Sequence, residues 1–90
     1  MGRTADPEIA AKYKIEFGER LARYRSGLGW SQGQFAARLE ISEWRYAKYE
    51  RGKAEMPYWL LDKLKAITGE GLDYWVLGRA SIRVFAKRSS

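Results

Sequence analysis

The sequence predicts an all-α fold, a compact domain of five helices, and three observations point to it. Apolar residues recur every three or four positions, which is the period of an amphipathic helix. The alternation of apolar and polar residues that is typical of a strand is absent before residue 80. Serines and glycines separate the apolar segments, at positions where helices begin and end. A chain of 90 residues can form one domain with a single modest core.

The first helix is expected over residues 7–25. Asp6 and Pro7 form a start signal, because aspartate caps a helix and proline is tolerated at the first helical position. Gly18 lies inside this helix at a cost of about 1 kcal/mol relative to alanine, so a bend there is compatible with the sequence. The inward stripe is predicted to consist of Ile9, Tyr13, Phe17, Leu21 and Tyr24.

Two short helices are expected next, over residues 31–39 and 43–51. Ser31 and Gln34 have the spacing of a capping box, and Ser42 is placed to cap the following helix. The inward side of the first of these helices is predicted to consist of Phe35, Ala36 and Leu39.

Two more helices complete the domain, over residues 58–68 and 71–77, and both end at a glycine. Their inward positions are predicted to be Leu60, Leu61, Leu64, Ile67, Leu72, Trp75 and Val76. Residues 1–78 are therefore assigned to one domain. Residues 79–90 form a basic tail in which Ile82 and Val84 follow the two-residue period of a strand. This tail is interpreted as a frayed end, a dimerisation arm, or a segment that lies along a phosphate backbone.

Charge and composition exclude several kinds of site. The chain has 17 basic and 11 acidic residues, a net charge of +6, and it has neither cysteine nor histidine. Disulfides, thiolate nucleophiles and the usual zinc ligands are therefore absent, and we expect no metal, cofactor or small-molecule ligand. Nothing supports an enzyme. The first fourteen residues have no apolar run, so we expect no signal peptide or membrane anchor and a cytoplasmic protein. The positive charge either keeps the protein soluble or attracts a polyanion.

The helix over residues 43–51 presents two different sides. At about 100° per residue, Tyr46 and Tyr49 fall on one side and are predicted to face the core. Trp44, Lys48 and Arg51 fall on the opposite side, with Ala47 and Arg45 flanking them. An indole beside two cations suits a binding surface, although it could also pack on a neighbouring loop. The major groove of duplex DNA admits one such helix.

From about Phe17 to Gly78, the chain resembles the phage-repressor and Cro type of helix-turn-helix regulators, the Xre-like family. The matching stretches are "RLARYRSGLGWSQGQFAARLEISEWRYAKYERGK" and "LDYWVLG". They include the S-Q pair that opens one helix, an F-A-x-x-L core pattern, I-S before the next helix, and Y-E-R-G-K after it. The resemblance implies a lambda-repressor-like fold and double-stranded DNA as the partner.

The resemblance also implies roles for particular residues. Arg25 and Glu50 are expected to form an ion pair inside the domain. The residues expected to contact bases are Ser42, Glu43, Trp44, Arg45 and Lys48. The residues expected to contact phosphates are Ser31, Gln32, Arg51 and Lys53.

Two positions depart from the family pattern. Glu40 stands where the family usually has a turn glycine, so either that turn avoids a positive φ or strain is stored there. Glu43 and Trp44 replace the commoner small or amide side chains where base reading begins. Glutamate can accept a hydrogen bond from cytosine, and tryptophan can cover a thymine methyl group or a sugar.

Two functions fit these features. The first is a small homodimeric transcriptional repressor that reads a palindromic or pseudo-palindromic operator through the major groove with residues 43–51. The second is an antitoxin or another protein-interaction module, in which DNA binding is secondary and the protein partner is a toxin or polymerase.

Overall fold

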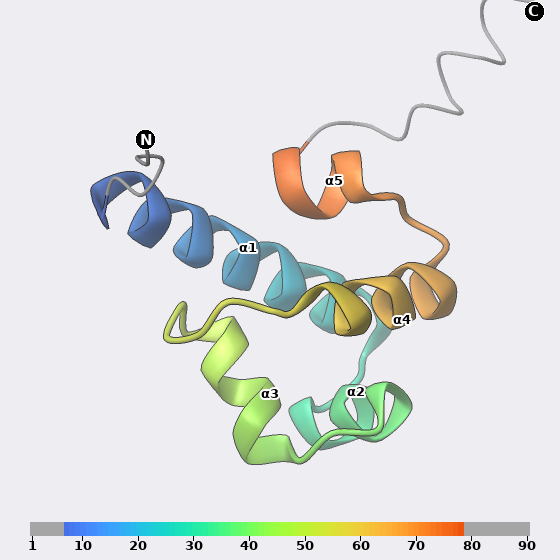
Figure 1. The fold of residues 1–90 in the computed structure, drawn as a ribbon. Helices are drawn as coiled ribbons and strands as arrows, with labels where there is room; N and C mark the ends of the chain where they lie inside the picture. The colour runs from blue at the N-terminus through green and yellow to red at the C-terminus, as the bar shows by residue number, and fades with distance from the viewer. Residues whose placement is uncertain (1–6, 79–90) are drawn as a thin grey trace, which may run out of the picture. The chain divides into compact units, whose positions relative to one another are not determined.

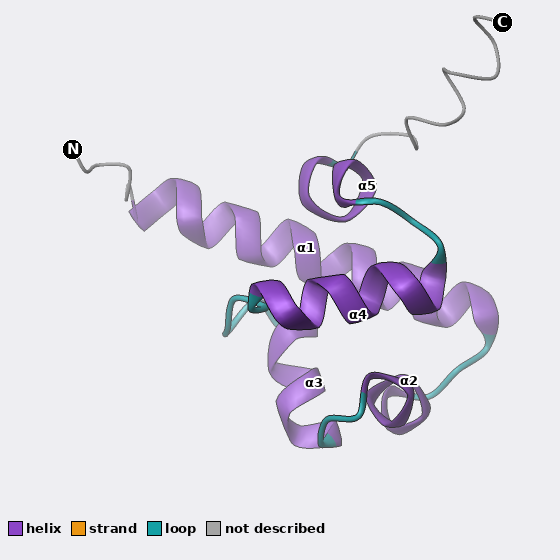
Figure 2. Ribbon diagram, turned by 45° about the vertical axis from the view of Figure 1, so that its right-hand side comes forward, coloured by secondary structure: helices purple, strands orange, loops and turns teal. Residues whose placement is uncertain are grey.

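The structure is a computed structural model that describes residues 7–78. Within these residues the chain forms helices and loops without a strand, and the predicted all-α fold is confirmed (Figures 1 and 2). The five helices are α1 (Pro7–Leu28), α2 (Gln32–Leu39), α3 (Glu43–Glu50), α4 (Tyr58–Thr68) and α5 (Leu72–Leu77). The tail over residues 79–90, including its expected extended arm, lies outside the described residues.

The chain forms two compact units whose boundary lies between Glu55 and Met56. The first unit holds α1, α2 and α3, and the second holds α4 and α5. Both α1 and α2 contact α3 within the first unit, so the inner side of α3 is covered by two helices.

Helix α1 is longer than the sequence predicts and is buried over a shorter stretch. It continues to Leu28 and ends at Gly29, which takes a left-handed φ of 74°. The predicted inward stripe is wrong at its start, because Ile9 is 68% exposed. The first buried residue of α1 is Phe17, so the first turns of the helix do not contribute to the core.

Gly18 serves a close approach between helices. The helix runs unbroken through this position. A Cβ atom added at Gly18 would lie 2.5 Å from the carbonyl oxygen of Tyr49 and closer still to that of Glu50. Only a residue without a side chain lets α1 meet the last turn of α3 at this distance, which explains why a glycine stands inside the helix despite its unfavourable helix propensity.

Aromatic rings fill the centre of the first unit. The ring of Phe35 on α2 is fully buried and lies 5.3 Å from the rings of both Trp30 and Tyr46, and 6.3 Å from that of Tyr24. Aromatic pairs at these separations add to the stabilisation that comes from area burial alone. This cluster joins all three helices of the unit and fixes which side of α3 faces inward.

The second unit is organised around a small polar junction. Leu60, Leu64 and Trp75 are completely buried. The indole nitrogen of Trp75 donates a hydrogen bond to the Thr68 hydroxyl at 3.2 Å, and that hydroxyl donates to the carbonyl oxygen of Leu64 at 2.8 Å. The last turn of α4 is thereby tied to α5. The other positions predicted to face inward are only partly buried, and these are Leu61, Ile67, Leu72 and Val76.

Candidate nucleic-acid interface

A tight turn joins α2 to α3. Glu40 ends α2 in the left-handed conformation with φ 63° and ψ 39°. The turn therefore does not avoid a positive φ, and a non-glycine residue adopts the strained conformation there. The N–H of Ile41 returns to the carbonyl oxygen of Ala36 at 3.0 Å. Ser42 is extended and its hydroxyl accepts the N–H of Arg45 at 3.0 Å, which starts α3 as a capped helix. The direction of α3 is therefore set by backbone and cap hydrogen bonds at its first residue.

The inward side of α3 is broader than the helical period alone predicts. Tyr46 and Tyr49 are 0% and 2% exposed, as predicted. Ala47, which is predicted to flank the outward side, is also buried, at 9% exposed. The reason is that α3 packs against two helices rather than one, which widens its covered arc to include a small residue between the tyrosines.

The Glu50 carboxylate accepts hydrogen bonds from four donor atoms and links the end of α3 to α1 and α2. Glu50 accepts hydrogen bonds from Arg25 Nε at 2.6 Å and Nη2 at 3.2 Å, so the expected partners do form an ion pair. It also accepts from the Tyr46 hydroxyl at 2.6 Å and from Gln32 Nε2 at 2.9 Å. Arg25 Nη1 donates to the carbonyl oxygen of Trp30 at 3.0 Å. The cluster therefore links both ends of the α1–α2 loop to the last turn of α3.

This environment shifts the pKa values of the clustered groups. Burial opposes ionisation of Glu50, but hydrogen bonds from Arg25, Tyr46 and Gln32 outweigh it and lower the pKa of the carboxyl below its usual value. Burial, reinforced by the hydrogen bond to the Glu50 carboxylate, raises the pKa of the Tyr46 hydroxyl well above its usual value. Glu50 is therefore charged and Tyr46 neutral at neutral pH, which suits a structural cluster better than a catalytic one.

The outward side of α3 presents an aromatic ring and a cation together. The Trp44 side chain is 70% exposed, so it does not pack on a neighbouring loop. The Lys48 ammonium lies 4.3 Å from the centre of the Trp44 ring, within the range of a cation–π interaction. The two side chains are one helical turn apart, which brings them onto the same face.

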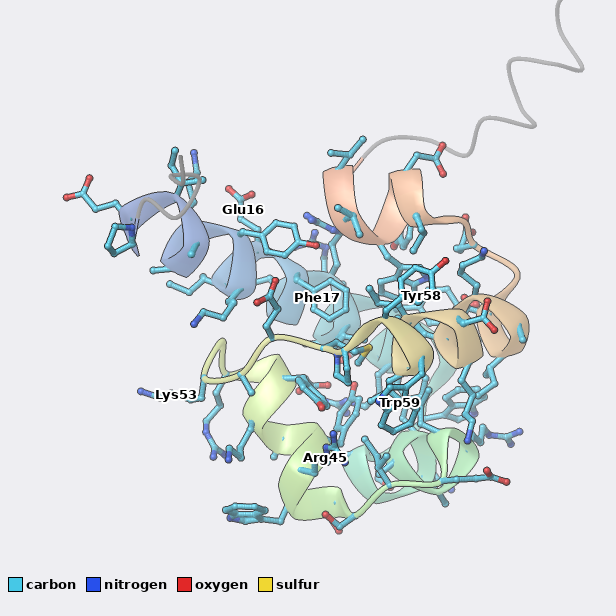
Figure 3. All side chains as sticks on the ribbon, viewed as in Figure 1. Glu16, Phe17, Arg45, Lys53, Tyr58 and Trp59 are labelled. Atoms are coloured by element: carbon cyan, nitrogen blue, oxygen red, sulfur yellow. The ribbon has the colours of Figure 1, made fainter. Side chains whose placement is uncertain are left out.

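The other three candidate base-contacting side chains have contacts within the protein. The Ser42 hydroxyl is the cap described above. Arg45 projects from α3 (Figure 3), and its Nε donates to the Tyr49 hydroxyl at 3.0 Å. Glu43 leans toward the first turn of α2, since its Oε1 lies 3.0 Å from where a Cβ of Gly33 would stand.

The candidate phosphate-contacting residues lie at the start of α2 and after α3. Ser31 and Gln34 form the predicted capping box, with bonds of 3.0 and 2.8 Å. Gln32 is oriented by Glu50, and one hydrogen of its amide nitrogen remains for another acceptor. Arg51 and Lys53 are both exposed, and Lys53 points away from the ribbon (Figure 3).

Sequence reasoning missed three contacts that shape this surface. It did not predict that Gln32 and Tyr46 both donate to the Glu50 carboxylate. Gln32 is distant from Glu50 in the sequence, and Tyr46 appears apolar in a helical wheel. It treated Gly18 as a weak point of α1 rather than as a contact with α3. The stacking of Lys48 on Trp44 could have been predicted from their spacing of four residues on a helix.

Comparison with known proteins identifies the class of domain. The family profile described as "Helix-turn-helix domain" matches residues 16–71, which is more than half of the chain. The protein therefore belongs to the helix-turn-helix domain family, and the resemblance to Xre-like regulators is confirmed.

A named relative lies within this family. The chain is 44% identical over 62 residues to the SPbeta prophage-derived uncharacterized HTH-type transcriptional regulator YonR of Bacillus subtilis (strain 168). The match covers 69% of this chain and 57% of that protein, so the chain spans little more than half of its length. No solved structure matches the chain significantly.

Residues 7–78 contain neither a membrane-spanning helix nor a metal-binding cluster. None of the described helices has the length and apolarity needed to cross a membrane. No group of three or more acidic side chains in this part of the chain is arranged to hold a metal ion.

Proposed function

We propose that this protein is a DNA-binding transcriptional regulator that acts in the cytoplasm, with residues 1–78 as its DNA-binding domain. The observation that carries the proposal is the difference between the two sides of α3. Its inner side is fixed by buried tyrosines and the Glu50 cluster, while its outer side carries the exposed Trp44 and the half-buried Lys48. A helix held in this way can enter a groove without losing its own packing.

The dimensions of α3 and the basic residues that follow it suit the major groove. An α-helix with its side chains is about 10–12 Å across, and the groove is about 12 Å wide. Four of the side chains proposed to reach bases lie at the N-terminal end of α3, which is the end that helix-turn-helix domains place against base edges, and Lys48 lies one turn further along. Arg51 and Lys53 lie just after α3, where they can contact phosphates, and the net charge of +6 favours association with a polyanion.

A regulator of this size needs a second copy to be selective. One helix touches only a few base pairs, and at roughly 1–3 kcal/mol per good base contact it would not distinguish a site from genomic competitors. Two copies reading half-sites about 34 Å apart would multiply the discrimination. We place the dimer contact on α5, where Leu77 is 58% exposed, and on the tail over residues 80–88. Occupancy of a pseudo-palindromic operator would repress transcription by blocking polymerase.

In-vitro selection of duplexes at a fixed salt concentration tests this proposal. Palindromic enriched sequences with a spacing of about one helical turn are expected. Lys53→Ala should weaken binding to all sequences alike and lower the salt slope by about one unit, whereas Lys48→Ala should relax preference at one base position. Binding that keeps the same sequence preference and the same salt response in both variants would contradict the proposal.

A second function is favoured by aromatic side chains in the second unit. Tyr58 and Trp59, at the start of α4, are 77% and 53% exposed (Figure 3), and aromatic residues are enriched in protein interfaces. The same chain could therefore act as an antitoxin or bind polymerase. Binding to such a protein partner should survive Trp44→Ala combined with Lys48→Ala, while operator binding should not.

A further inference from the structure

We propose that Trp44 and Lys48 act as a single base-reading unit, which recognises the methyl group of a thymine beside a guanine in each half-site. This inference rests on the proposed function and specifies what the outer side of α3 recognises. It concerns the chemistry of the DNA site and therefore goes beyond the assignment of the domain to DNA binding.

Contacts inside the protein single out this pair among the five candidate base-contacting residues. Ser42 uses its hydroxyl to cap α3, and Arg45 is held by the Tyr49 hydroxyl. Glu43 lies against the first turn of α2 at Gly33. Within residues 7–78, the Lys48 ammonium donates to no carboxylate or carbonyl, and its one described contact is the Trp44 ring. The pair is thus the part of the outer side whose described contact is with each other rather than with the body of the protein.

The geometry of the pair orders both groups before DNA arrives. The ammonium is 4.3 Å from the ring centre, so it covers part of one ring face and leaves the remaining ring surface open. With 70% of Trp44 exposed, that surface is large and apolar. A long lysine side chain ordinarily loses rotamer freedom when it binds, and stacking on the ring reduces this loss because the side chain is already placed.

The chemistry of base edges then identifies the ligand. Thymine carries the one apolar group on the major-groove edge of an unmodified base pair, its C5 methyl, and this is the group that an open indole surface can bury. Guanine presents the two acceptors O6 and N7 to a cation. Successive bases are about 3.4 Å apart along the helix axis. Since ring and ammonium are 4.3 Å apart, they fit neighbouring base pairs rather than separate parts of the site.

Thymine-to-uracil substitution tests the ring contact, because it removes only the methyl group. The full chain is used to select a duplex from a random pool, and the enriched duplex is resynthesised with deoxyuridine at one thymine position at a time. One substitution in each half-site should weaken binding about fourfold, the change that burial of one methyl group produces. Trp44→Ala should bind the thymine and uracil duplexes equally, and Trp44→Phe should keep part of the difference.

A second substitution tests the ammonium contact. Placing 7-deazaguanine at the neighbouring guanine removes its N7 acceptor and should weaken binding of the unmodified protein about fivefold. Lys48→Met keeps the length of the side chain without its charge and should be insensitive to this change. Thermal unfolding followed by circular dichroism checks that each variant is folded.

The outcomes separate this inference from the proposed function. If an enriched palindrome binds with a salt-dependent affinity but no single uracil substitution weakens it, the ring lies on a sugar or phosphate, and the inference is overturned while the proposed function stands. Sensitivity to uracil that persists in Trp44→Ala would also overturn it. If no duplex is enriched, the inference and the proposed function fail together.

Discussion

The inner and outer sides of α3 differ in how completely their side chains are engaged within the protein. On the inner side, Tyr46 and Tyr49 are almost fully buried, and every oxygen of the Glu50 carboxylate accepts two hydrogen bonds. On the outer side, Trp44 is 70% exposed and its one described polar neighbour is Lys48. A helix of only 8 residues is therefore stabilised from one side, which leaves the other side able to change its sequence at little cost to folding.

The largest effect is expected from removing the carboxylate on the inner side. Glu50→Ala leaves Arg25, Tyr46 and Gln32 without their shared acceptor, and breaking a buried ion pair costs about 3–5 kcal/mol. Urea unfolding measures the loss. Glu19→Ala, at an exposed position of α1, should change stability by less than about 0.5 kcal/mol. Equal stabilities of the two variants would show that the Glu50 cluster does not hold α3.

The next largest effect is expected at the helix crossing. Gly18→Ala should destabilise the protein by about 2–3 kcal/mol, because its Cβ would clash with backbone carbonyl oxygens that cannot rotate away. Gly27→Ala is the matched control in the same helix. Nothing lies within 4 Å of its Cβ position, so the gain in helix propensity should raise stability by up to about 1 kcal/mol. Thermal unfolding of the two variants should move in opposite directions, and a shared direction would contradict the close approach of α1 and α3.

Acid should lower the free energy of unfolding by less than Glu50→Ala does. The pKa of Glu50 is lower in the folded protein than in the unfolded chain. Its contribution to stability is therefore present above the unfolded value of about 4.3 and is lost as the pH falls through the lower, folded value. The difference in unfolding free energy between the unmodified protein and Glu50→Gln should be constant near neutral pH and shrink below about pH 4.3. A difference that stays constant into acid would mean that the Arg25 contact does not lower the pKa of Glu50 in the folded protein.

The sequence predicted the elements of this surface more successfully than their connections. Helix existence, both serine caps and the inward direction of Tyr46 and Tyr49 follow from spacing and local hydrogen-bonding chemistry, which act within a few residues. The shared use of Glu50 by Gln32, and the role of Gly18, depend on residues brought together by packing, for which a single sequence carries no periodic signal. Ile9 is the opposite case. It belongs to the regular apolar spacing of α1, but it lies outside the buried part of the helix.

The smallest effect on stability, and the sharpest contrast between the two sides, is expected from paired aromatic substitutions on α3. Trp44→Ala should change the free energy of unfolding by no more than about 0.5 kcal/mol, because the ring is exposed and contacts mainly Lys48. Tyr49→Ala, five residues further along the chain, should cost about 3 kcal/mol, because it opens a cavity in the core. The order should reverse for DNA: at a temperature where both variants are folded, Trp44→Ala should lose more affinity for an enriched duplex than Tyr49→Ala. A large stability loss in Trp44→Ala would mean that its ring supports the fold, and the outer side of α3 would then not be reserved for a partner.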